Sequence, residues 1–293
     1  MNISKVAVYG LGNMGYLVAE RVAARFATKV SDLDRAQVRR ACDSFKAEPI
    51  EGPQDVGDVD VVVLSLPSPA ISLAILEQIA PVLPRHAVVL ETSTVNPKDM
   101  HACKRLLDRF GLRIVDASVA AGVSQMKAGT ATLLLGGPQP AIDDSRPVLD
   151  AIAEKQIYFG DTGAGAAAKV INNAVAHAVM VVVAEAGSLA TAAGVSREKL
   201  VELLADKQMG LHRPLTHRYA ERIMQGNYEG GMPLDAARKD SVLALELAQN
   251  LGVPLFAIQG SHTIYEIAAA AGYGRDDYAA IAKVWADWGK PAV

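Results

Sequence analysis

The feature that most constrains the fold is an alternation, over the first 160 residues, between short apolar runs and stretches with helical spacing. The runs are Lys5–Tyr9, Val59–Leu66, Ala87–Leu90, Leu112–Val115, Thr132–Leu135 and Gln156–Phe159, and the helical stretches include Gly15–Phe26 and Ile71–Leu83. Continuous apolar runs rich in β-branched residues are typical of strands buried on both faces. Because each crossover between such strands places a helix over the sheet, we predict a doubly wound, mainly parallel α/β domain.

The pattern changes after Gly160, and from Gly165 onward almost every segment has helical spacing. We predict two domains, an α/β domain over residues 1–163 and an all-α domain over residues 164–293, joined by a long helix. The apolar stretch 174–194 is long enough to cross a membrane. His177 and Glu185 interrupt it, and a carboxylate at membrane depth is costly, so we expect a helix buried between domains.

Composition excludes several classes of protein. The formal charge is −3, with 29 basic and 32 acidic residues, so no basic surplus predicts binding to nucleic acid or to an anionic membrane. Two cysteines are too few for a disulfide framework, and the six histidines form no ligand pattern, so we predict no metal site. The chain begins without the charged and apolar pattern of a secretory leader, and we expect a cytoplasmic protein.

A glycine-rich loop follows the first apolar run and precedes a helical stretch. Its sequence is Gly10-Leu11-Gly12-Asn13-Met14-Gly15. In such a loop Gly10 permits a tight turn, Gly12 lets backbone amides approach a pyrophosphate, and Gly15 allows close packing of helix and strand. The loop stands at the start of a β-α-β unit, which is the context that a dinucleotide site requires.

Asp32 lies 22 residues after Gly10 and directly follows the strand-like segment Lys29-Val30-Ser31, which we expect to be the second strand of the β-α-β unit. A carboxylate there accepts hydrogen bonds from the adenosine ribose and repels a 2′-phosphate, so we predict NAD rather than NADP. Asp34 is placed to cap the helix that begins near Arg35, while that arginine leaves room for NADP.

Two more loops follow predicted strands, at the edge where open α/β sheets bind ligands. They are Ser65–Pro69 and Glu91–Thr94. We include Leu66, Pro67 and Thr94 among the cofactor-binding residues, and a hydroxyl in the second loop is suited to a nicotinamide ribose. Taken alone, each loop also fits an ordinary turn between a strand and a helix.

Lys169 and Asn173 lie four residues apart near the start of the long helix, and hence on one helical face. Small and apolar residues surround Lys169, which disfavours a fully solvated lysine. A partly desolvated ammonium beside a cationic nicotinamide has a lowered pKa and can serve as a general acid or base. The amide of Asn173 can hold a substrate oxygen.

The whole chain resembles the β-hydroxyacid dehydrogenases, the group that contains 3-hydroxyisobutyrate dehydrogenase and tartronate semialdehyde reductase. The resemblance rests on the glycine loop, on Asp116–Gly122 running to Ala128-Gly129-Thr130, on the segment from Gly160 to Asn173, and on Arg238-Lys239-Asp240. It implies hydride transfer between a nicotinamide cofactor and a small 3-hydroxy acid or its semialdehyde or keto form. It also implies a Rossmann domain, a helical domain that mediates dimerisation, and a homodimer or homotetramer.

The resemblance assigns roles to individual residues. Lys169 is the catalytic residue that it implies, Asn173 a substrate-binding residue, and Lys239 a contact near cofactor or substrate. The substrate-binding segment contains Ser118, Ala120, Ala121 and Gly122. Here the chain departs from the family pattern, because Ala120 replaces a serine that holds the substrate and Ala121 replaces a glycine. Ser118 and Ser124 are nearby hydroxyls, and the departure leaves the identity of the substrate open.

Two alternatives stay open at this point. An imine reductase shares the architecture that the resemblance implies but usually lacks the lysine, so Lys169 and Asn173 argue against it. The second alternative is a non-catalytic NAD(H)-binding protein, and the altered substrate segment is the one feature that supports it.

Overall fold

The computed structural model describes residues 3–286 and residue 288. It divides into two compact units, Met1–Ala174 and Val175–Val293. The predicted domain boundary after residue 163 coincides with the start of helix α7, Ala164–Ala192, whereas the compact units divide inside that helix.

The first unit is built on an eight-stranded sheet with the strand order β3-β2-β1-β4-β5-β6-β7-β8. Every neighbouring pair is parallel except β6 and β7, which are antiparallel. The strands are β1 Lys5–Tyr9, β2 Ala27–Ser31, β3 Glu48–Pro49, β4 Val61–Leu64, β5 Val88–Glu91, β6 Arg113–Ala120, β7 Thr132–Gly136 and β8 Lys155–Tyr158. The prediction of a doubly wound, mainly parallel sheet is confirmed.

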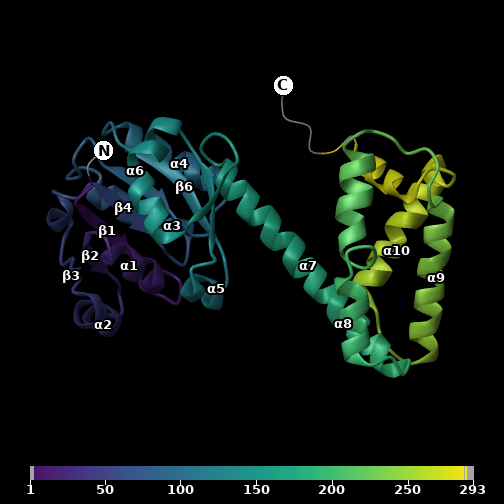
Figure 1. The fold of residues 1–293 in the computed structure, drawn as a ribbon. Helices are drawn as coiled ribbons and strands as arrows, with labels where there is room; N and C mark the ends of the chain where they lie inside the picture. The colour runs from purple at the N-terminus through teal and green to yellow at the C-terminus, as the bar shows by residue number, and fades with distance from the viewer. Residues whose placement is uncertain (1–2, 287, 289–293) are drawn as a thin grey trace. The chain divides into compact units, whose positions relative to one another are not determined.

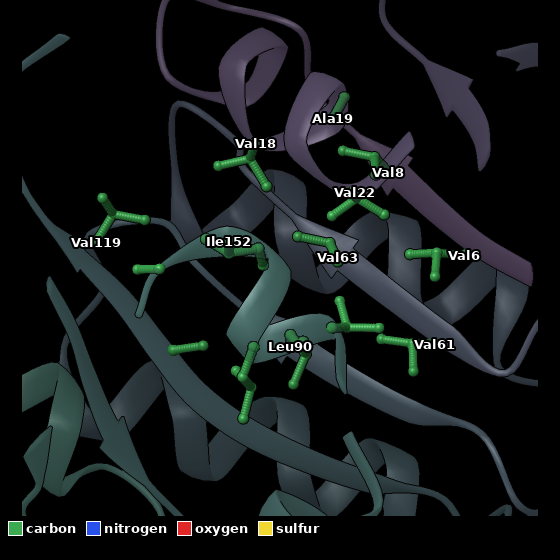
Figure 2. Packing of buried hydrophobic residues seen from close by; sticks show 14 of the residues in the cluster. Val6, Val8, Val18, Ala19, Val22, Val61, Val63, Leu90, Val119 and Ile152 are labelled. Atoms are coloured by element: carbon green, nitrogen blue, oxygen red, sulfur yellow. The ribbon is translucent and has the colours of Figure 1, made fainter. Parts of the chain in front are cut away.

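Helices cover both faces of this sheet (Figure 1). They are α1 Gly15–Ala23, α2 Arg35–Phe45, η1 Pro53–Val56, α3 Pro69–Ile79, α4 Pro97–Asp108, α5 Val123–Ala128 and α6 Gln139–Ile152. One core cluster joins the sheet to α1, α2 and α6, and Figure 2 shows Val18 and Val22 of α1 facing Val8 and Val63 of the strands. A second cluster joins the opposite face to α3 and α4. Two buried layers explain why the strands carry unbroken apolar runs.

Strand β6 differs most from its prediction. The apolar run predicted a strand over Leu112–Val115, but β6 continues to Ala120 and includes most of the segment that the family resemblance treats as a substrate loop. The reason is a change of partner at Asp116. Residues up to Asp116 pair with β5, and residues from Asp116 onward pair with β7. The pairing with β7 was not visible in the apolar pattern of β6 itself.

Asp116 also receives the start of α7. Its carboxylate accepts hydrogen bonds from the amides of Gly163 at 2.8 Å and Ala166 at 3.1 Å. The backbones approach so closely that a Cβ on Gly165 would lie 2.6 Å from the carbonyl oxygen of Leu134. A buried carboxylate thus satisfies the free N–H groups of the helix end and ties α7 to the sheet.

The second unit is helical in its described part, as predicted. Beyond its share of α7 it contains α8 Arg197–Ala205, η2 Pro214–Ile223, α9 Leu234–Asn250, α10 Phe256–Ala268, η3 Ala269–Tyr273 and η4 Tyr278–Trp285. Glu185 of α7 accepts hydrogen bonds from the amides of Phe256, Ala257 and Ile258, at 2.7 to 3.1 Å. These bonds lower the pKa of Glu185 and cap α10, which explains a carboxylate in an otherwise apolar helix.

Helix α7 is long and apolar enough to cross a membrane, by length and composition only, with a mean hydropathy of 1.6 over its most apolar 18 residues. Only 11% of that stretch is buried. The expectation of a buried helix is therefore wrong for the single chain. Met180 and Val181 are 60% and 51% exposed. The expectation assumed that the apolar residues of α7 are covered within one copy, and the chain covers only a minor part of them.

We predict that Asp116→Ala destabilises the protein by about 3 kcal/mol, because it leaves the buried amides of Gly163 and Ala166 without an acceptor. Urea unfolding followed by circular dichroism measures this change. The matched control is Asp143→Ala, which removes an exposed carboxylate from α6. Equal stability of the two variants would contradict the role given to Asp116.

Candidate active site

The glycine loop has the close packing that its sequence predicts. Gly10 has a φ of +95°, and a Cβ there would lie 2.1 Å from the carbonyl oxygen of Ser65. A Cβ on Gly15 would lie 2.1 Å from the carbonyl oxygen of Gly10. Around Gly12, by contrast, no atom lies within 4 Å of the Cβ position. Gly10 and Gly15 are thus required by the turn and by helix packing, and Gly12 leaves open space above the start of α1.

Asp32 is held beside this loop by the backbone. Its carboxylate accepts hydrogen bonds from the amide of Leu11 at 2.6 Å and from the amide of Asp34 at 2.8 Å. Asp34 caps α2 by accepting the amide of Ala36 at 2.8 Å, which confirms its predicted capping role. Asp32 is therefore free of a capping role, and its partly exposed carboxylate retains lone pairs for other donors.

A pocket of about 330 Å³ opens next to the loop and Asp32. It is lined by Leu11, Gly12, Asn13, Tyr16, Leu17, Asp32, Asp34, Gln37, Arg40, Val123 and Lys127. The structure thus brings four of the predicted cofactor-binding residues together, namely Leu11, Gly12, Asn13 and Asp32. Met14 stands at the N-terminal end of α1.

The other side of this pocket is formed by residues that were not predicted from the sequence. The guanidinium of Arg40 stacks over the ring of Tyr16 at 4.2 Å, and Lys127 adds a second cation from α5. Tyr16 and Gln37 were detectable in principle, since one follows the glycine loop and the other lies in the first turn of α2. Lys127 lies in a distant segment, directly before the Ala128-Gly129-Thr130 match, and nothing in the sequence indicated that this lysine meets the glycine loop.

The loops after β4 and β5 lie side by side at the carboxyl edge of the sheet. The hydroxyl of Ser93 accepts the amide of Leu66 at 2.8 Å, and the hydroxyl of Thr92 donates to the carbonyl of Leu64 at 2.6 Å. Pro67 and Thr94 are exposed at the surface of these loops. The predicted contacts Leu66, Pro67 and Thr94 therefore lie in two loops that a hydrogen bond joins at this edge.

The predicted substrate segment has a buried part and an open part. Ser118 is 1% exposed, and its hydroxyl donates to the carbonyl of Ser93 at 3.5 Å. Ala120 and Ala121 are partly exposed, and Gly122 is exposed at the start of α5. The Ser118 hydroxyl therefore makes its hydrogen bond inside the domain. The exposed part of the segment consists of the methyl groups of Ala120 and Ala121 and of Gly122.

Lys169 and Asn173 both lie on α7 within the first compact unit, four residues apart. Lys169 is partly buried, and burial lowers the pKa of its ammonium group. Within residues 3–286 no carboxylate pairs with it within 4.0 Å, so no ion pair offsets this effect. Ala166, whose amide Asp116 holds, precedes Lys169 by one turn, and the same contact that starts the helix also places the lysine.

Lys239 lies apart from these residues, in the second unit on α9, where it is exposed and its ammonium lies 3.1 Å from the carboxylate of Asp240. Its predicted contact with cofactor or substrate stays a prediction. In the part of the chain that the structure describes, no three histidine, cysteine or acidic side chains gather into a metal site.

These features fit a bound dinucleotide. An open glycine, a helix N-terminus and a carboxylate held at the end of β2 are the three elements that recognise pyrophosphate and ribose. The site lies where the strand order reverses between β1 and β4, which is the ligand-binding position of open α/β sheets.

Two family descriptions match the chain. Residues 5–160 match the NAD binding domain of 6-phosphogluconate dehydrogenase, and residues 163–285 match the family described as NAD-binding of NADP-dependent 3-hydroxyisobutyrate dehydrogenase. Among curated relatives, 2-(hydroxymethyl)glutarate dehydrogenase of Eubacterium barkeri is 31% identical over 286 residues, with 96% of this chain and 94% of that protein covered.

Solved structures share the fold. The 3-hydroxyisobutyrate dehydrogenase of Mycobacterium tuberculosis with L-serine has a TM-score of 0.68 at 24% identity, covering 97% of this chain and 99% of that one. An imine reductase variant of Myxococcus stipitatus in complex with NAD+ has a TM-score of 0.84 at 18% identity, with the same coverage.

Matches of this extent along both halves confirm the family that the motifs indicated and a cofactor that is NAD or NADP. The chain belongs to the β-hydroxyacid dehydrogenase family of nicotinamide-dependent oxidoreductases.

Proposed function

We propose that this protein transfers a hydride between NAD(H) and a small 3-hydroxy acid or its semialdehyde or keto form. The observation that carries the proposal is Lys169, a partly buried amine with a lowered pKa, on a helix whose start is tied to the sheet of the nucleotide domain. The 31% identical relative is named for 2-(hydroxymethyl)glutarate, which is itself a 3-hydroxy acid, and this supports the substrate class.

Each residue then has a defined part in the reaction. Lys169 accepts the proton of the substrate alcohol during oxidation and returns a proton to the carbonyl oxygen during reduction. Asn173, on the same face of α7, holds a substrate oxygen without exchanging protons. The nicotinamide, when bound, supplies or receives the hydride at its C4 atom. Ala120, Ala121 and Gly122 offer the substrate methyl groups and backbone rather than a hydroxyl.

The imine reductases and a non-catalytic NAD(H)-binding protein are the two alternatives. The fold alone does not separate the first from a dehydrogenase, but Lys169 and Asn173 favour the dehydrogenase. A panel of small hydroxy acids, aldehydes and cyclic imines with NAD(H), followed at the nicotinamide absorbance band, separates all three. Turnover of hydroxy acids and not of imines is the expected result.

We predict that Lys169→Ala lowers kcat by about 10² to 10⁴-fold, because the proton of the alcohol loses its acceptor. Binding of NADH, measured by fluorescence titration, is expected to stay close to that of the unaltered protein. Lys169→Arg is expected to lose a similar factor, because a guanidinium does not release its proton in this pH range.

The matched control for Lys169 is Lys199→Ala, which removes an exposed lysine from α8. The pH profile gives a second check. Oxidation requires the neutral amine, so its rate should rise with pH through a pKa below the usual lysine range, and Lys169→Ala should lose this dependence. An unchanged kcat in Lys169→Ala would refute the assignment.

The carboxylate of Asp32 is the reason to propose NAD as the preferred cofactor. We predict a higher kcat/KM with NAD than with NADP, since the carboxylate repels a 2′-phosphate. Asp32→Asn keeps an acceptor for the amide of Leu11 and removes the charge, so the ratio should move toward NADP by about tenfold. Asp43→Asn, an exposed change on α2, is the control. A clear preference of the unaltered protein for NADP would contradict the proposal.

The exposed apolar residues of the second unit support a homodimer or homotetramer. Large apolar side chains are exposed on α7, α8, α9 and α10, and many exposed apolar residues on one domain are typical of an interface between subunits. They include Met180, Val181, Val201, Leu203, Leu243, Leu247, Phe256 and Ile267. We propose a second copy of the chain as the partner, and we propose the cytoplasm as the compartment, consistent with the free cysteines Cys42 and Cys103.

We predict that the protein elutes as a dimer or tetramer in size-exclusion chromatography with light scattering. Met180→Arg should shift the population toward monomer, because an arginine would then have to be buried in the interface. Ile157→Arg, a change at an exposed apolar residue of β8 in the first unit, serves as the control. A monomeric unaltered protein at micromolar concentration would contradict the proposed assembly.

A further inference from the structure

Glu91 is a buried carboxyl group that the proposed function does not use. It is the last residue of β5, is 1% exposed, and lies in register with Leu64 of β4 on one side and Asp116 of β6 on the other. A buried carboxyl is costly unless it is protonated or satisfied by hydrogen bonds. Its contacts therefore indicate what it does for the fold or the site.

Those contacts lead to the two loops at the carboxyl edge of the sheet. One oxygen of Glu91, Oε1, accepts the amide of Ser93 at 2.9 Å. The hydroxyl of Ser93 in turn accepts the amide of Leu66 at 2.8 Å. The chain of contacts from Glu91 through Ser93 to Leu66 thus joins the loop after β5 to the loop after β4.

The other oxygen of Glu91, Oε2, and the Ser72 hydroxyl are both buried, and neither makes a hydrogen bond of standard geometry within the described residues. The Ser72 hydroxyl still lies close enough to Glu91 to lower its pKa. Burial raises the pKa of Glu91 and outweighs the hydrogen bonds from Ser93 and Ser72, which lower it, while the negative charge of Asp116 adds to the effect of burial. Glu91 therefore retains its proton to a higher pH than an exposed glutamate does. One of its oxygens, Oε1, is engaged as an acceptor.

The position of these loops connects them to the cofactor. Asp32 assigns the adenosine half of a dinucleotide to β2, on one side of the point where the strand order reverses, so the nicotinamide half falls on the side of β4 and β5. We propose that Glu91 is a positioning residue for the nicotinamide half of the site, holding Ser93 and through it Leu66 and its loop. This inference rests on the proposed function for the identity of the ligand.

Two substitutions of Glu91 show whether its acceptor oxygen or only the volume of its side chain matters for the loops. Glu91→Gln keeps an acceptor oxygen for the amide of Ser93 and is neutral, whereas Glu91→Met keeps the approximate volume and has no such acceptor. We expect Glu91→Met to raise the Kd for NADH by about tenfold, and Glu91→Gln to recover most of this loss. Glu77→Gln and Glu77→Met, at an exposed position on α3, are the matched controls.

Hydrogen exchange of the Leu66 amide, measured by mass spectrometry or NMR without cofactor, tests the positioning independently of the ligand. Protection should fall in Glu91→Met and persist in Glu91→Gln. Ser93→Ala removes the acceptor of the Leu66 amide and leaves Glu91 intact, so protection of this amide should fall in that variant too. If Glu91→Met does not fold, Ser93→Ala is measured in its place.

The outcomes are distinguishable. Unchanged protection of the Leu66 amide together with an unchanged Kd for NADH in Glu91→Met would overturn the inference. An equal loss of NADH affinity in Glu91→Gln and Glu91→Met would also overturn it, because the charge of Glu91 would then be what matters. If the unaltered protein binds no NADH while the contrast in protection holds, the proposed function fails and the positioning of the loop by Glu91 stands.

Discussion

The start of α7 depends on one buried interaction, the carboxylate of Asp116 accepting the amides of Gly163 and Ala166. The free N–H groups of a helix end must find acceptors, and a buried end has no water to supply them. By placing that acceptor on the strand where β6 changes partners, the fold determines where α7 leaves the sheet. Lys169 follows one turn later, so the same contact that stabilises the fold orients the residue proposed for proton transfer.

Buried carboxyl groups recur at such junctions. Glu185 of α7 caps the start of α10 within the second unit, and Glu91 connects two loops at the edge of the sheet. The chemistry differs with the surroundings. Three amides lower the pKa of Glu185, whereas burial outweighs the hydrogen bonds to Glu91 and raises its pKa. A carboxylate that looks out of place in an apolar stretch is therefore explained by the helix or loop that it satisfies.

The candidate site shows which features of a structure can be anticipated from the sequence. The glycine loop and Asp32 were predictable because their roles depend on local backbone geometry over a few residues. That Tyr16, Arg40 and Lys127 together form the second wall of the pocket was not predictable, since these side chains come from three helices and meet only after packing. Ser118 illustrates the reverse case, because its residue type indicated a substrate contact while the extension of β6 buried it.

The sequence by itself determined the order of the longer strands and helices, the nucleotide loop and the family, and it predicts the pair Lys169 and Asn173, because periodicity and short motifs are local properties of the chain. It did not indicate the two-residue strand β3. Tertiary structure alone decided the partner change of β6 at Asp116, the burial of Ser118 and the exposure of Met180 and Val181 on α7. Burial and strand pairing depend on which distant segments come together, and residues close in sequence do not carry that information.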